Sequence, residues 1–142
     1  MQYLLLNQTS KNPGGSSTGS AVAVAAGFSP LAIGAETIGS IITPANRAAL
    51  YAIKPTVGVQ DTGGSFTLTD SFDSPGPMTK SAEDVLLLTE ILLGKQFDRG
   101  GLASWDGMSV GFLDPEVWKM GEETCRQHAG TAEQMVRGPD MA

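Results

Sequence analysis

Residues 13–49 consist mostly of glycine, serine, alanine and threonine, and this run of small side chains limits what the chain can fold into. Small side chains allow neighbouring backbones to approach closely. Within the run, Thr18–Ala26 is predicted to form a helix that ends at Gly27. Pro30 then opens the short apolar run Leu31–Ile33, which predicts a buried strand. The first structural unit that the sequence predicts is therefore a small-residue helix followed directly by a strand.

The clearest helix is predicted over Ala82–Leu93. Ser81 is a favourable N-cap, and Asp84 three residues later gives a capping-box-like pattern. Gly94 ends the helix. The side chains of this helix are so apolar that other parts of the protein must cover most of its sides. The stretch 58–78 is rich in glycine and proline and predicts a loop. Helices that alternate with short strands predict an α/β fold.

Composition excludes several classes of function. The chain has 142 residues, the length of one ordinary domain. Its single cysteine, Cys125, excludes an internal disulfide and a cysteine-based zinc site. The net charge is -6 and no basic stripe is present, so we expect no nucleic-acid partner. No apolar stretch is long enough to span a bilayer, and the N-terminal residues do not form a signal peptide, which favours a cytoplasmic location.

Two glycine-containing turns could carry chemistry. The turn Gly14–Ser20 leads into a helix N-terminus, where exposed backbone N–H groups bind anions or hold hydroxyl groups near a charge. By itself it fits an anion-binding module or a flexible turn with a cap. In the second turn, over 34–41, Gly39 next to Ser40 would let backbone amides converge near a hydroxyl, as an oxyanion hole requires. Taken alone, an ordinary strand-to-helix turn is the simpler interpretation; Pro44 places the helix start near Ile42 or Thr43.

The order of the motifs is more specific than either turn. Along the chain the sequence reads Gly14-Gly15-Ser16-Ser17, Gly34-x-Glu36-Thr37-x-Gly39-Ser40-Ile41, Pro44-Ala45, Lys54-Pro55-Thr56 and Asp73-Ser74-Pro75-Gly76-Pro77-Met78. This order resembles the amidase signature family, in its fungal-type branch, over residues 12–94. The resemblance implies a mixed sheet flanked by helices, of which this chain would hold a part.

The resemblance also implies a Ser-cisSer-Lys hydrolase. Ser40 matches the family nucleophile, and Ser16 matches the bridging serine, whose peptide bond with the preceding residue is cis in family structures. Ser17 matches a hydroxyl that supports the network. The oxyanion-hole segment of the family corresponds to Thr37, Ile38, Gly39 and Ser40. The implied reaction is cleavage of an amide C–N bond in a small molecule through an acyl-serine, with no metal or organic cofactor; the sequence does not specify the amide.

One family feature has no counterpart in the sequence. The family lysine that acts as base lies well upstream of the Gly-Gly-Ser-Ser motif, and Lys11 is the only lysine before Ser16 here. Lys11 lacks the family context, and Lys54 matches a Lys-Pro-Thr segment whose lysine is not the base in relatives. Two interpretations stay open: a hydrolase segment that acts when complete, and an inactive fragment that lacks the lysine.

The ends of the chain also depart from the family. We expect an unmatched leader over 1–11, a partial amidase domain over 12–137 and an unmatched tail over 138–142. This pattern predicts a truncated family member whose apolar surface other parts would cover. We therefore expect poor stability of the isolated chain and association with the missing parts or with a full-length relative.

Overall fold

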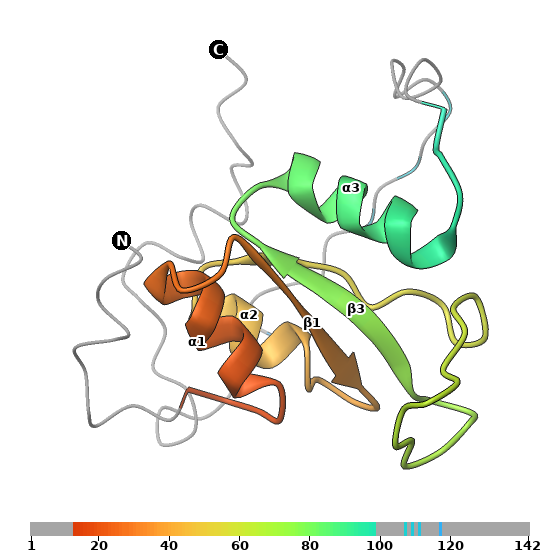
Figure 1. The fold of residues 1–142 in the computed structure, drawn as a ribbon, viewed down its shortest axis with the longest axis horizontal. Coiled ribbons are helices and arrows are strands. Elements are labelled where there is room, and N and C mark those ends of the chain that lie inside the picture. Colours follow the sequence, from red (N-terminus) through yellow and green to blue (C-terminus); the bar gives the residue numbers. More distant parts are fainter. Residues whose placement is uncertain (1–12, 99–106, 108, 110, 112–116, 118–142) are drawn as a thin grey trace. The chain divides into compact units, whose positions relative to one another are not determined.

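The computed structural model describes residues 13–98 together with residues 107, 109, 111 and 117. The chain divides into two compact units, Met1–Arg99 and Gly100–Ala142. All helices and strands described below lie in the first unit (Figure 1). In chain order they are α1 (Thr18–Ala26), β1 (Leu31–Glu36), α2 (Ile42–Arg47), β2 (Tyr51–Ala52), β3 (Ser74–Thr79) and α3 (Ala82–Leu93).

The strands form one sheet in the order β1-β3-β2, and both pairs are antiparallel. β3 pairs with β1 along its whole length, from Leu31 opposite Thr79 to Glu36 opposite Ser74. Figure 1 shows β1 and β3 between α3 on one side and α1 with α2 on the other. The α/β fold that the sequence predicts is thus confirmed, and β1 and α2 place the 34–41 turn at one end of the sheet.

The central strand β3 corrects the end of the loop predicted over 58–78, whereas residues 58–73 contain no helix or strand, as predicted. Pro75 and Pro77 led to that prediction, because proline has no N–H to donate to a sheet. In the structure β2 pairs only with Met78 and Thr79, so at both prolines β3 has a paired strand on the β1 side alone. A strand that is paired on one side tolerates proline, because the missing N–H can lie on the other side.

Strand β1 is longer and less buried than predicted. It extends beyond the expected Leu31–Ile33 as far as Glu36. Leu31 is half-buried and Ile33 is 48% exposed, whereas Gly34 and Glu36 are buried. β1 is less buried than predicted because it is an outer strand of the described sheet and its residues alternate between two faces.

The helix boundaries agree with the sequence predictions. α1 spans Thr18–Ala26, and Gly27 follows it with a φ of 82° in the left-handed region. α3 spans Ala82–Leu93, and the Ser81 hydroxyl accepts a hydrogen bond from the N–H of Asp84, as the capping pattern implies. α2 begins at Ile42, so Pro44 lies in its first turn, where a missing N–H is tolerated.

The core lies between the sheet and the two small helices. Its buried cluster consists of Ala21, Ile41, Ala45, Ala48 and Met78. Ile41 and Met78 have no exposed surface. The alanines come from α1 and from α2 with the residue after it, and their small side chains let both helices pack against the sheet. The small-residue run of the sequence thus supplies most of this core.

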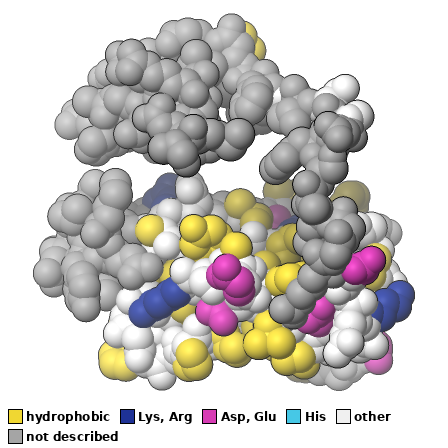
Figure 2. Space-filling model, turned by 90° about the horizontal axis from the view of Figure 1, so that it is seen from above, with side chains coloured by type: hydrophobic (Ala, Val, Ile, Leu, Met, Phe, Trp, Pro, Cys, Tyr) yellow, Lys and Arg dark blue, Asp and Glu magenta, His cyan; other side chains and the backbone are white. Residues whose placement is uncertain are grey.

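Helix α3 is covered on fewer sides than the sequence suggested. It contacts β3 and β2, and Leu88 is buried. Leu87 and Ile91 are 46% and 65% exposed, although the sequence analysis expects most sides of the helix to be covered. Figure 2 shows further hydrophobic side chains on the visible surface of the described part. Among the described residues, no helix has both the length and the apolar character needed to cross a membrane.

Met78 is predicted to contribute strongly to stability, because its buried side chain joins the sheet to α1 and α2. Met78→Ala should lower the free energy of unfolding by about 2–5 kcal/mol, measured by urea denaturation of the 142-residue chain. The exposed Ile91 provides the control, and Ile91→Ala should change the same quantity by less than about 0.5 kcal/mol. Equal losses in both variants would contradict the core described here.

Candidate active site

The structure joins the Ser16–Ser17 turn to the turn that contains Ser40. The N–H of Ser17 donates to the carbonyl oxygen of Ser40 at 3.0 Å. The peptide bond between Gly15 and Ser16 is cis, as the resemblance implies. Ser16 is exposed and Ser40 is half-buried. Two segments that are more than twenty residues apart in the sequence therefore meet at the two serines predicted to react.

Serine hydroxyls from the α1 region form hydrogen bonds with backbone groups on the outer edge of β1. The Ser17 hydroxyl accepts from the N–H of Ala35 and donates to its carbonyl oxygen, both at 3.1 Å. One turn further along α1, the Ser20 hydroxyl donates to the carbonyl oxygen of Ile33 at 2.8 Å. These contacts give the edge of the strand the partners that a further strand would supply. Ser17 thus fixes the helix against the strand that leads to Ser40.

Gly34 makes this close approach feasible. A Cβ atom at this position would lie 2.8 Å from the Ser17 hydroxyl oxygen and 3.0 Å from Cε of Met78. No side chain fits there unless the strand and α1 move apart. Gly34 therefore has a packing role, which the sequence motif alone did not assign.

A buried carboxylate organises the turn after β1. Oε2 of Glu36 accepts hydrogen bonds from the N–H groups of Ile41, at 2.8 Å, and Ile42, at 2.9 Å. Burial by itself raises the pKa of Glu36. The N–H groups of Ile42, Gly39 and Ile41 and the charge of Lys54 together hold that pKa below its ordinary value. Glu36 therefore stays ionised and ties the end of β1 to the start of α2.

Sequence analysis gave Glu36 no role in the site, although it lies in the matched motif. The available signal was a carboxylate four residues before Ser40 and just ahead of a predicted helix start, where the helix dipole favours an anion. Its burial could not be read from the sequence, because it depends on how the turn folds back over the strand.

The backbone of the turn leaves two N–H groups free to bind an anion. Gly39 has a φ of 80°, in the left-handed region that glycine adopts readily. Its carbonyl oxygen accepts from the N–H of Thr43 at 2.8 Å, and the carbonyl of Ser40 is held by Ser17. Within the described part of the chain, the N–H groups of Ile38 and Ser40 have no hydrogen-bond partner. Two such donors in one turn suit a developing oxyanion.

Side chains from two distant segments hold Thr37 at the start of the turn. Nζ of Lys54 donates to the carbonyl oxygen of Thr37 at 2.6 Å. The Thr37 hydroxyl donates to Oδ1 of Asp73, whose other oxygen accepts from the N–H groups of Leu68 and Thr69. The Thr37 hydroxyl is the main cause that lowers the pKa of Asp73, and burial opposes it. Lys54 and Asp73 thus contact the segment that is predicted to form the oxyanion hole, and the sequence analysis assigned neither residue to the site.

The described contacts do not connect all of the predicted site residues. Among residues 13–98, no hydrogen bond involves the hydroxyl of Ser16 or that of Ser40. Lys11 lies outside the described residues. The described residues contain no cluster of three or more His, Cys, Asp or Glu side chains that could hold a metal ion.

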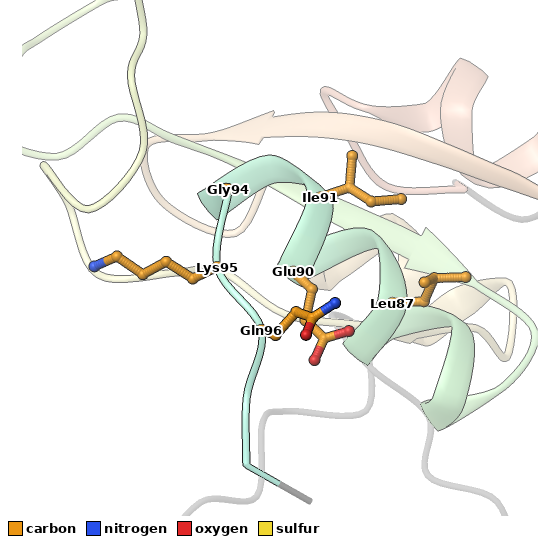
Figure 3. A pocket seen from close by; sticks show the side chains of 6 residues that line it. All are labelled: Leu87, Glu90, Ile91, Gly94, Lys95 and Gln96. Carbon is orange, nitrogen blue, oxygen red and sulfur yellow. The ribbon is translucent and has the colours of Figure 1, made fainter.

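A separate pocket lies at the C-terminal end of α3 (Figure 3). Its lining residues are Leu87, Glu90, Ile91, Gly94, Lys95 and Gln96. None of these belongs to the two serine turns or contributes a nucleophile. The chemistry that the turns can support therefore does not involve this pocket.

The comparisons with known proteins follow the same segments. The family model described as Amidase matches residues 7–127. The A subunit of the glutamyl-tRNA(Gln) amidotransferase of Methanocaldococcus jannaschii is 51% identical over 83 residues, which cover 58% of this chain and 19% of that protein. Its counterpart from Deinococcus radiodurans, which has the same name, is 41% identical over 113 residues, covering 71% of this chain and 23% of that protein.

Solved structures give the same result. A crystal structure of an amidase matches with a TM-score of 0.62 and 42% identity, covering 64% of this chain and 21% of that one. The native peptide amidase from Stenotrophomonas maltophilia matches with a TM-score of 0.56 and 38% identity, covering 72% and 21%. This chain spans about a fifth to a quarter of the length of the relatives named here.

The Glu36 carboxylate is predicted to make stability depend on pH. Its pKa in the folded chain lies below the ordinary value of 4.5, so its stabilisation is complete above that value and is lost as the pH falls through the folded-state pKa. Glu36→Gln should therefore unfold at lower urea concentration at pH 7 and should lose less stability between pH 5 and pH 3 than the wild-type chain. Glu83 is exposed, and Glu83→Gln should follow the wild-type profile.

Proposed function

The chain belongs to the amidase family, and on that basis we propose that it carries the reacting serine of an amide hydrolase. Ser40 is the nucleophile of this proposal, and Ser16 is the relay that takes its proton. The observation that carries it is the arrangement of the turn, in which the N–H groups of Ile38 and of Ser40 itself have no partner among the described residues. A nucleophile needs such donors where the substrate carbonyl oxygen becomes negative.

The proposed reaction proceeds through an acyl-serine. A neutral lysine base accepts the proton of Ser16, Ser16 accepts the proton of Ser40, and Ser40 Oγ bonds to the amide carbonyl carbon. The carbonyl oxygen becomes an oxyanion that the N–H groups of Ile38 and Ser40 bind. The C–N bond then breaks as the lysine returns its proton through Ser16 to the leaving nitrogen, and water hydrolyses the ester and restores the Ser40 hydroxyl. In family members the base comes from upstream of the Gly-Gly-Ser-Ser motif, so this segment supplies the nucleophile, the relay and the oxyanion hole.

Substrate and partner are proposed only as classes. The relatives named above include a peptide amidase and the A subunits of two amidotransferases, which supports an amide substrate. A protein named as one subunit works in an assembly, and this supports association of the present chain with further parts of an amidase or with a full-length relative. The finer assignment to the fungal-type branch stays a prediction, since the relatives named are archaeal and bacterial.

Ser40 is predicted to react selectively with a fluorophosphonate, a reagent that phosphonylates activated serines. In the 142-residue chain, Ser40 should be labelled faster than the exposed Ser65, because Ser40, unlike Ser65, lies in the turn that presents the proposed oxyanion donors. The label is located and timed by mass spectrometry of tryptic peptides. Ser40→Ala should abolish the fast labelling, Ser16→Ala should slow it, and Ser65→Ala should leave it unchanged. Labelling of Ser40 at the rate of Ser65 would contradict the proposal.

Gly39 is predicted to be required for the same reaction. A Cβ atom there would lie 2.9 Å from the Thr43 hydroxyl oxygen at a φ that alanine adopts poorly. Gly39→Ala should therefore turn the neighbouring N–H groups and slow the labelling of Ser40 by roughly 10²–10³-fold, the effect of losing an oxyanion donor. Gly19 on α1 has open space around it, and Gly19→Ala is the matched control. Labelling of Gly39→Ala at the wild-type rate would show that this turn does not bind the oxyanion.

The alternative of an inactive segment makes a different prediction about turnover. Release of ammonia from a peptide amide by the 142-residue chain, abolished by Ser40→Ala, would exclude it. Labelling of Ser40 without any release of ammonia would favour it over an active hydrolase.

A further inference from the structure

The direction of the Ile38 N–H is set by the carbonyl group of Thr37. Both belong to one peptide unit, which is planar, and in the trans form the C=O and N–H bonds point in opposite directions. The Gly15–Ser16 bond is the cis bond among the described residues, so the Thr37–Ile38 bond is trans. A group that holds the Thr37 oxygen therefore aims the Ile38 N–H the other way.

Lys54 holds that oxygen. Its Nζ donates at 2.6 Å from the segment after β2, seventeen residues along the chain from Thr37. Lys54 is half-buried, and its charge lies near the carboxylates of Glu36 and Asp73. A charged donor makes a stronger hydrogen bond than a neutral one, so this contact is well suited to fix a peptide plane.

Asp73 holds the side chain of the same residue. It precedes β3 and accepts the Thr37 hydroxyl, while the N–H groups of Leu68 and Thr69 occupy its second oxygen. Both carboxylate oxygens are thus engaged, and Asp73 cannot rotate without breaking several contacts. Thr37 is therefore bonded at its carbonyl oxygen by Lys54 and at its hydroxyl by Asp73, which come from two different segments.

We propose that Lys54 and Asp73 are positioning residues that hold the Thr37–Ile38 peptide so that the Ile38 N–H faces the oxyanion. This inference rests on the proposed function of the Ser40 turn. It gives Lys54 a role other than that of base, because its Nζ donates to the carbonyl oxygen of Thr37 and acts through that residue. Neither residue touches the reacting atoms.

The kinetic test uses the fluorophosphonate labelling of Ser40 in the 142-residue chain. Lys54→Met keeps the apolar stem and removes the donor, and it should slow the labelling at least about tenfold, part of the effect of losing one oxyanion donor. Lys54→Arg should restore most of the rate, because arginine can still donate to the carbonyl. Lys80→Met, the same change at an exposed lysine, should label at the wild-type rate. Asp73→Ala should also slow the labelling. In the double variant with Lys54→Met, the labelling rate should fall by a smaller factor than the product of the two single reductions, because both residues act on one peptide.

A spectroscopic test reads the same contact without any reaction. In Lys54→Met the ¹³C resonance of the Thr37 carbonyl and the amide resonances of Ile38 should shift, while in Lys80→Met they should stay in place. Unchanged resonances in Lys54→Met, or an unchanged labelling rate while Ser40→Ala loses the label, would overturn the positioning role and leave the proposed function standing. Loss of the proposed function has a different signature, in which wild-type Ser40 is labelled no faster than Ser65.

Discussion

The carboxylate of Glu36 is the contact on which the geometry of the turn depends. It ends β1, is almost fully buried, and receives the N–H groups that open α2. A buried charge is tolerated only when hydrogen bonds replace the water that it loses, and backbone N–H groups do so here. Because the carboxylate belongs to the end of β1 and its donors belong to the start of α2, this contact fixes the direction in which the chain leaves the sheet. The position of Ser40 between strand and helix follows from that direction.

Close approach of backbone segments is the second constraint. Gly34 allows Ser17 to reach the edge of β1, and Gly76 allows β3 to pass the carbonyl oxygen of Ile53, which would lie 2.2 Å from an added Cβ atom. The alanines of α1 and α2 have the same effect inside the core. A chain with larger side chains at these positions would keep its helices, but it could not bring the two serine turns together.

The sequence predicted those features that depend on neighbours in the chain. The limits of α1 and α3 follow from Ser81, Gly27 and Gly94, which act within one helical turn. The strand β3 was missed, because the tolerance of Pro75 and Pro77 depends on how short β2 is. In the site, the two serine turns were identified by their motifs, whereas Glu36, Lys54 and Asp73 were not. The roles of the last two depend on contacts that span seventeen and thirty-six residues, which no local pattern records.

Asp73 connects two parts of the molecule through hydrogen bonds to both of its carboxylate oxygens. One of its oxygens closes the loop that contains Leu68 and Thr69, and the other is bonded to Thr37. The loop and the turn therefore share one anchor, and a displacement of the loop is transmitted to the peptide that begins the turn. Under the proposed function, a ligand that displaced this loop would also change the alignment of Ser40, so that ligand recognition and the rate of reaction would be coupled through Asp73.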